Sequence, residues 1–454
     1  MYRAFLYMCI LSILLTFQFL LTACTQSTKK VEQEKTSSTW QMKMQELSAV
    51  FSELMPIVAN DQKFSDVKNK AIIEKDTEAL RKLAHSLKTA KLPKNSDPSL
   101  KMTAELFEED ISRAKVLLMA GQMSAARVIL RDTSSYCIQC HTQSSSGPNF
   151  PKMNLNFSTD GLSRLEKAEL YVSLRRFDQA LVEFTKIIED KSFAAEHVFE
   201  WEQAARSAIA ISVKVENDPN KTLVLVRKIA ANPSTPQFVK ESIAPWEASV
   251  QEWRRERKPL LMAPPETLRN VEKMILRAQS KQKYPLDHSQ DILFFRASSI
   301  LHEVLAFHNA NDEIKARALY LSGMTAEDTR DLNFWTLHET YYELCVRTVP
   351  HTDLARQCFD KFNNSMIIGY SGSAGVSIPI EIQAKINDLK VLSSALPNPE
   401  AESNQKNPAT PPANATGVTV APAGSTPVPS PNPTAPTPAP TKLENKTDSL
   451  KDTP

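Results

Sequence analysis

The sequence is poor in glycine, with nine in 454 residues. A turn-rich β fold needs many glycines, because its tight turns use backbone conformations that other residues avoid. Helix-forming residues dominate instead, and apolar residues recur at helical rather than alternating spacing. The ordered part of the chain is therefore predicted to be all-α.

An excess of one charge is also lacking, since 54 Lys and Arg stand against 52 Asp and Glu, a net charge of +2. This balance argues against a nucleic-acid partner.

Hydrolytic motifs are missing as well. His302 and His338 each precede a glutamate as in zinc proteases, but neither has the second histidine of HExxH. The segment GYSGSAG (369–375) lacks the G-x-S-x-G nucleophile pattern. No catalytic residue is expected.

Cysteine is scarce too, with six in the chain, but two of them stand in SYCIQCH (135–141). In this CxxCH motif, Cys137 and Cys140 can add across the two vinyl groups of a haem, and His141 can bind the iron as axial ligand. The alternative is a disulfide or half of a zinc site, although zinc usually takes four protein ligands and the other cysteines are far away in sequence. A multi-haem peroxidase is disfavoured, because the motif occurs once.

The N-terminus indicates the compartment. Residues 1–23 have the form of a secretory signal peptide, in which a basic residue precedes a short apolar stretch. The motif LTAC (21–24) resembles a bacterial lipobox, which implies cleavage before Cys24 and lipidation of that cysteine. Residues 24–37 then form a flexible tether. Thr25, where Asp would signal retention in the inner membrane, favours the outer membrane with the protein facing the periplasm, on the side where cytochrome c matures. The alternative is an uncleaved transmembrane anchor.

Two further cysteines, Cys345 and Cys358, flank VRTVPHTDLARQ (346–357). If this segment turns between two antiparallel helices, both sulfurs lie at a similar distance from the turn. A disulfide between them is expected in an oxidising periplasm. The alternative is two buried free thiols. With Cys9 in the signal peptide, the disulfide leaves no cysteine unassigned, which supports the haem.

The composition changes at about residue 396, where Pro, Ala, Thr, Ser and Asn replace large apolar residues. Such a segment cannot bury enough apolar surface to fold, so residues 396–454 are predicted to be a disordered tail. A spacer is its simplest role, and binding to peptidoglycan or another surface is the alternative.

Residues 38–146 divide into four predicted helices with short loops. The third opens at Asp97-Pro98, a cap followed by a proline at the first helical position, and Gly121 ends it. The fourth runs into Cys137. Four helices joined in this way favour an antiparallel bundle, which can hold a cofactor between facing helices.

The stretch FEEDISRAKVLLMAGQMSAARVILRDTSSYCIQCH (107–141) resembles the last two helices of cytochrome c′, a family of four-helix monohaem cytochromes. The shared features are a Phe in the third helix, Ala-Gly at the turn, an Arg early in the fourth helix and CxxCH near its end. The resemblance implies one covalent haem c on Cys137 and Cys140, with His141 as axial ligand. The family often has a basic residue shortly after the histidine, whereas TQSSSGPNF (142–150) has none, which weakens the case for gas discrimination there.

In this family the first helix covers the distal face of the haem. The resemblance places Met44 at the distal position, where a thioether ligand raises the potential and favours electron transfer. Three alternatives stay open: Met44 packs in the core, Met42 is the ligand in a shifted register, or His85 of the second helix binds the iron.

Residues 160–395 are predicted to form a second helical region. Its segment KAELYVSLRRFDQALVEFTKIIED (167–190) resembles a tetratricopeptide repeat, with Tyr171, Ala180 and Phe184 at helix-contact positions. Further helices are predicted at 194–216, 236–256, 265–280, 288–308, 332–348 and 353–368. Stacked helix pairs of this kind bind other proteins. The alternative is a plain helical domain without a groove.

Together these features predict a lipid-anchored periplasmic c-type cytochrome. Its single haem transfers one electron at a time or binds a small gas, and its helical region docks it to a periplasmic or membrane redox partner. The alternative is an outer-membrane interaction scaffold with a structural or sensory haem.

Overall fold

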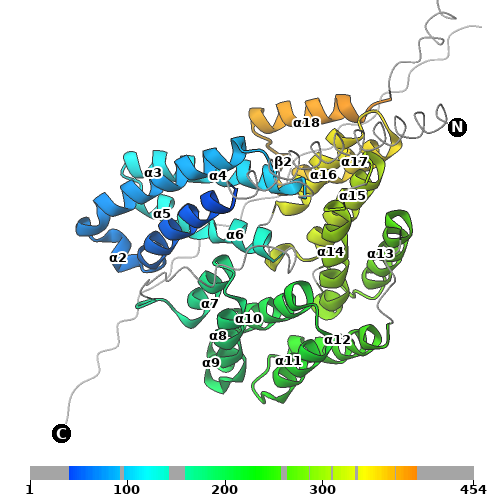
Figure 1. Ribbon diagram of the computed structural model, residues 1–454, viewed down its shortest axis with the longest axis horizontal. Helices are drawn as coiled ribbons and strands as arrows, with labels where there is room; N and C mark the ends of the chain where they lie inside the picture. The colour runs from blue at the N-terminus through cyan, green and yellow to red at the C-terminus, as the bar shows by residue number, and fades with distance from the viewer. Residues whose placement is uncertain are drawn as a thin grey trace, which may run out of the picture. The chain divides into compact units, whose positions relative to one another are not determined.

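The computed structural model describes residues 40–92, 97–142, 159–256, 263–285, 287–307, 310–332, 336–373 and 375–395. Within these ranges the protein is almost entirely α-helical (Figure 1), as the sequence predicts. The strands found there are a short antiparallel pair, β1 (Ser371–Gly372) and β2 (Gly375–Val376). None of the described helices is long and apolar enough to cross a bilayer. The predicted signal peptide, Cys24, the predicted tether and the predicted tail lie outside the described residues.

The first part of the chain begins with a helix over residues 40–59. It continues through α2 (Asp61–Ser65), α3 (Val67–Thr89), α4 (Ser99–Met119), α5 (Met123–Asp132) and α6 (Ser134–His141). The residues predicted to start and end α4 lie at its two ends. The Asp97 carboxylate accepts a hydrogen bond from the Ser99 backbone N–H at 2.8 Å, and Gly121 takes a positive φ of 72° after the helix.

The predicted fourth helix is in fact two helices, α5 and α6, with Thr133 between them. The Thr133 hydroxyl donates to the Leu130 carbonyl at 2.6 Å. Such side-chain bonds compete with the backbone hydrogen bonds of a helix. The break separates the CxxCH helix from the rest of the predicted fourth helix.

The second part is a series of helices that pack mainly on their neighbours in sequence. They are α7 (Arg164–Ser173), α8 (Phe177–Glu189), α9 (Lys191–Glu196), α10 (Val198–Ile211), the π-helix η1 (Ser212–Glu216), α11 (Pro219–Ala231), α12 (Gln237–Arg255), α13 (Pro264–Gln279), the 3₁₀-helix η2 (His288–Gln290), α14 (Asp291–Leu305), α15 (Asp312–Asp328), the 3₁₀-helix η3 (Arg330–Leu332), α16 (Leu337–Thr348), α17 (Asp353–Gly369) and α18 (Ile380–Ser393). The sequence did not predict α11, α15 or α18.

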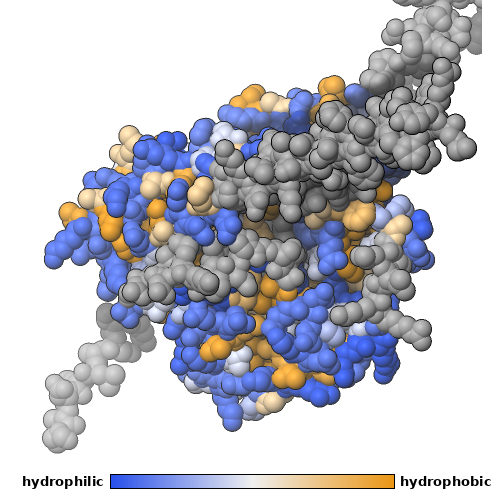
Figure 2. Space-filling view, viewed as in Figure 1, coloured by the Kyte–Doolittle hydropathy of each residue, from blue (hydrophilic) through white to orange (hydrophobic). Residues whose placement is uncertain are grey.

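The described helices belong to one compact unit with three hydrophobic clusters. The N-terminal core includes Leu54, Ile73, Ile111 and Leu130, and also Leu170 and Leu174 from the α7 region. The middle core includes Phe184, Trp201, Ile209, Val226 and Trp246. The C-terminal core includes Val271, Phe294, Leu319, Tyr341, Phe362 and Leu389. The outer face seen in Figure 2 is mostly hydrophilic, with smaller apolar patches, as expected of helices that each bury one side.

Two contacts join distant segments of this unit, and a disulfide joins two consecutive helices. Asp97, before α4, contacts His302 of α14, and Arg206 of α10 forms a buried ion pair with Asp291 at 2.6 Å. Cys345 of α16 and Cys358 of α17 form a disulfide with Cα atoms 6.1 Å apart, which is the pairing that the sequence predicts.

Candidate functional site

The helix α6 carries all three residues of the CxxCH motif. A helix turns by about 100° per residue, so Cys137, Cys140 and His141 fall within an arc of about 100° on one face. Two thiols and an imidazole therefore point to the same side of a single helical turn, as covalent haem attachment requires.

The three hydrophobic cores meet at α6. The ring of Tyr136 packs against both the N-terminal and the C-terminal core, Cys137 packs against the N-terminal core, and Ile138 packs against the middle core. The Tyr136 hydroxyl also donates to Asp110 Oδ2 at 2.6 Å, which ties α6 to α4. The motif helix is thus held by elements from the whole described chain.

The thiols of Cys137 and Cys140 are half-buried and form no disulfide. Burial raises the pKa of both thiols to about 12, and for Cys140 the nearby Cys137 and Asp97 add to the effect, while a hydrogen bond with Thr103 opposes it. Both sulfurs are therefore protonated at neutral pH in the absence of a cofactor.

A zinc site at the motif would need further protein ligands, and the described part of the chain places no set of them beside it. Cys345 and Cys358 are joined to each other and cannot supply thiolates. Among the described residues, no group of three or more His, Cys, Asp or Glu side chains is placed to hold a metal ion.

The imidazole of His141 is held neutral. Burial, followed by the charge of Arg175, lowers its pKa to about 4, against smaller opposite effects of hydrogen bonds between the ring and the backbone of Ser173 and Val172. Its Nδ1 is buried and has no hydrogen-bond partner in the described structure. Neutral imidazole is the form that binds metals, so the ring is in the state that an axial ligand needs.

Arg175 is a site residue that the sequence did not predict. Its Nη1 donates to the His141 backbone carbonyl at 3.0 Å, from the turn between α7 and α8. It has a positive φ of 56°, which is uncommon for a residue other than glycine, and burial lowers its pKa. A guanidinium thus lies beside the motif although TQSSSGPNF contains no basic residue. The chain separation explains why no local pattern indicated it.

The three candidate distal ligands have different surroundings. Met44 packs, partly buried, against the N-terminal core, as Cys137 also does. Met42 is 53% exposed. The His85 side chain is 58% exposed, and its Nδ1 lies 3.1 Å from Glu108 Oε1. Met44 is therefore the one of the three that lies against a core shared with the motif; iron ligation stays a prediction.

The donor set around α6 fits a covalent haem: two unpaired thiols and a neutral imidazole share one face of one helix. Comparisons of the chain with protein-family models, with curated proteins and with solved structures find no match.

Proposed function

We propose that this chain is a c-type cytochrome with one haem c on α6. Cys137 and Cys140 form the thioether bonds, and His141 is the axial ligand. The observation that carries the proposal is the pairing of the described cysteines. The two in CxxCH form no disulfide and lie beside a neutral imidazole, whereas Cys345 and Cys358 form a disulfide with each other. Such a haem supplies a centre for one-electron transfer or for binding a small gas.

The chain's own residues hold this site in place. Arg175 fixes the backbone of His141 through its carbonyl, and the bond from Tyr136 to Asp110 anchors the opposite side of α6. Both contacts restrict the position of the α6 backbone that carries the imidazole. We propose Met44 as the distal ligand, because it packs against the core that Cys137 also contacts.

We further propose that the first part of the chain is a cytochrome c′-like four-helix bundle and that the second part is a tetratricopeptide-like array. The shared N-terminal core and the packing of consecutive helices α7 on α8, α11 on α12 and α15 on α16 support these assignments. The array then docks a periplasmic or membrane redox partner, and lipidation of Cys24 holds the protein at the outer membrane. A scaffold with a structural or sensory haem is the second candidate.

The test is expression of the full chain in bacteria that contain a cytochrome c maturation system. We expect wild-type protein to keep haem stain after denaturing electrophoresis and to give a c-type pyridine haemochrome. Cys137→Ala with Cys140→Ala removes both signals, whereas the matched pair Cys345→Ala with Cys358→Ala keeps them. Wild-type protein without covalent haem, or stain that survives in the first variant, contradicts the proposal.

A second measurement separates the two candidates. Electron transfer or gas binding predicts that the iron is reduced reversibly and that either electron exchange or carbon monoxide binding is fast. A haem that does neither supports the structural role.

A further inference from the structure

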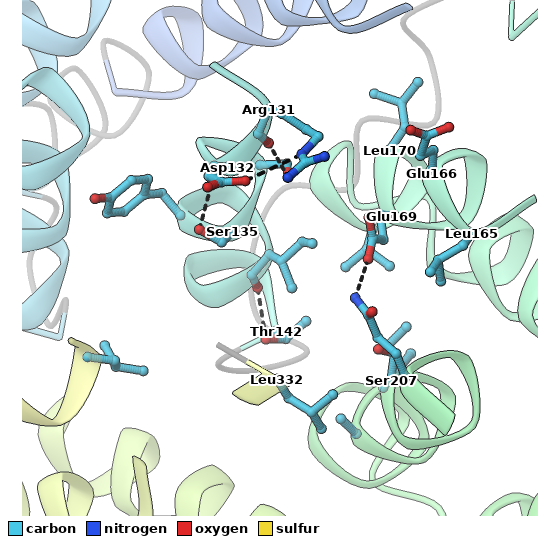
Figure 3. A pocket seen from close by; sticks show the side chains of 18 of the residues that line it. Arg131, Asp132, Ser135, Thr142, Leu165, Glu166, Glu169, Leu170, Ser207 and Leu332 are labelled. Atoms are coloured by element: carbon cyan, nitrogen blue, oxygen red, sulfur yellow. Dashed lines mark hydrogen bonds and ion pairs between the residues drawn. The ribbon is translucent and has the colours of Figure 1, made fainter. Parts of the chain in front are cut away.

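A cavity of about 660 Å³ lies beside α6, and its lining comes mainly from the helix over residues 40–59, α6, α7 and α10, with single residues or pairs from η1, α14, α15 and α16. Figure 3 shows Ser135 of α6 and Thr142, the residue after α6, on one side and Leu165 and Glu169 of α7 on the other. Cys137, Cys140 and His141 are not among the described residues that line it. The cavity thus has the size of a small-molecule site, and its described lining does not include the three residues that would hold the haem.

Lys214 places a buried ammonium group without a counter-ion at this cavity. It lies on the π-helix η1, it lines the cavity, and it is only 6% exposed. Within the described structure no hydrogen bond or ion pair reaches its ammonium group. The carboxylate of Glu216 on the same π-helix is occupied by Lys221 at 2.6 Å. Burial lowers the pKa of Lys214 to about 8, so the group still carries its charge at neutral pH.

The acidic residues of the lining do not neutralise Lys214, because each has another partner. Asp110 accepts from the Tyr136 hydroxyl, Asp132 pairs with Arg131, Glu166 accepts from the Ser163 N–H, Glu169 accepts from Gln203 at 2.7 Å, and Glu200 pairs with His197. A buried charge without a counter-ion is costly, and an anion that enters the cavity removes this cost.

The rest of the lining indicates what kind of anion fits. Phe184, Ile211, Phe295 and Leu332 give apolar walls. Ser322, which also lines the cavity, has a buried hydroxyl without a hydrogen-bond partner in the described structure. Among the described lining residues, one unpaired cation stands among several carboxylates, which suits a ligand with a single negative charge and disfavours phosphate, which carries more than one.

We propose that this cavity binds an apolar molecule with one carboxylate, and that Lys214 holds the carboxylate. Apolar contacts with the walls supply affinity, and the ammonium fixes the orientation of the ligand. A π-helix is rare and is frequent at functional sites, which agrees with the placement of Lys214. The proposal does not rest on the haem.

The test uses decanoate as the probe and 1-decanol as its uncharged match, both below micelle-forming concentrations, with the full chain in a calorimeter. We expect decanoate to bind wild-type protein at least tenfold more tightly than decanol. Lys214→Met should abolish this preference, and Lys221→Met, which removes an exposed lysine nearby, should keep it. Absence of decanoate binding to wild type, equal binding of the two probes, or an unchanged preference in Lys214→Met overturns the proposal.

A second readout needs no variant. Decanoate should protect Lys214, and not Lys221, from reductive methylation, as read by mass spectrometry of the digested protein. Equal labelling of Lys214 with and without decanoate contradicts the assignment even if the acid binds elsewhere.

Discussion

The Nδ1 of His302 lies 2.6 Å from Oδ2 of Asp97, although 205 residues separate them in the chain. Both side chains are buried, and the other oxygen of the same carboxylate caps α4 by accepting from the Ser99 N–H. One carboxylate thus starts the helix α4 and binds it to α14. Since α4 also contacts α6, this pair braces the motif helix from the side of the second part of the chain.

The replacement Asp97→Ala should lower the free energy of unfolding by ~3–5 kcal/mol, because it leaves His302 buried without its partner and removes the cap. Asp66→Ala is the matched control: Asp66 caps α3 through the Lys68 N–H in an exposed position, so its loss should cost only ~0.5–2 kcal/mol. Urea unfolding followed by circular dichroism measures both. Equal losses would show that the contact with His302 adds nothing.

Gly323 should not tolerate a side chain. A Cβ atom at this position in α15 would approach the Tyr342 ring of α16, with Cδ1 at 2.6 Å, whereas a Cβ at Gly369 of α17 would meet nothing within 4 Å. Gly323→Ala should therefore destabilise the protein by ~1–3 kcal/mol or more through overpacking. Gly369→Ala should be neutral or slightly stabilising, because alanine favours helix. Thermal unfolding distinguishes them, and matching melting temperatures would contradict the packing of α15 on α16.

The haem spectrum should depend on Met44. If its sulfur binds the iron, ferric wild-type protein is low-spin and the ferrous form binds carbon monoxide poorly. Met44→Ala should give high-spin, five-coordinate iron that binds carbon monoxide readily, while stability falls by less than the ~2–5 kcal/mol of a fully buried Met→Ala change, because Met44 is only partly buried. Met42→Ala and His85→Ala should leave the spectrum unchanged, because both side chains are exposed. High-spin wild-type iron would mean that Met44 is only packing.

Stability should fall with rising pH because of Glu169. Burial, with repulsion from Glu166, raises its pKa from 4.5 to about 7. The folded protein therefore keeps a proton that the unfolded chain loses, so stability decreases between pH 4.5 and 7 and the full loss is present above pH 7.

Glu169→Gln should remove this loss while keeping an acceptor for Gln203. It should stabilise the protein by ~1–3 kcal/mol at about pH 8 and change little at about pH 4. Unfolding at the two pH values measures the difference. A stabilisation that is the same at both pH values would rule out the titration of Glu169.

The sequence predicts those features that depend on neighbouring residues. Asp97-Pro98 and Gly121 delimit α4, the CxxCH spacing places three groups on one helical face, and the turn around 346–357 predicts the disulfide of α16 with α17. The helix α11 carried the same cap-and-proline signal, Asp218-Pro219, and could have been predicted from it.

Features that depend on distant residues could not be predicted in this way. Gly323 is an unfavourable residue inside α15, and its role appears only once Tyr342 lies against it. Arg175 reaches His141, and Asp97 reaches His302, across separations that no local pattern records. The π-helix that carries Lys214 has no sequence signature, so the cavity that it faces was not foreseen.

The position of α6 among three cores bears on the order of events during biogenesis. The C-terminal core, against which Tyr136 packs, is made of helices that follow the motif in the chain and are therefore synthesised after it. Under the proposed function, the enzyme that attaches the haem needs access to both thiols before those helices close around α6. Haem attachment then precedes the completion of folding. In a chain that folds before it receives haem, the C-terminal helices cover the motif and hinder access of the attaching enzyme to the two thiols.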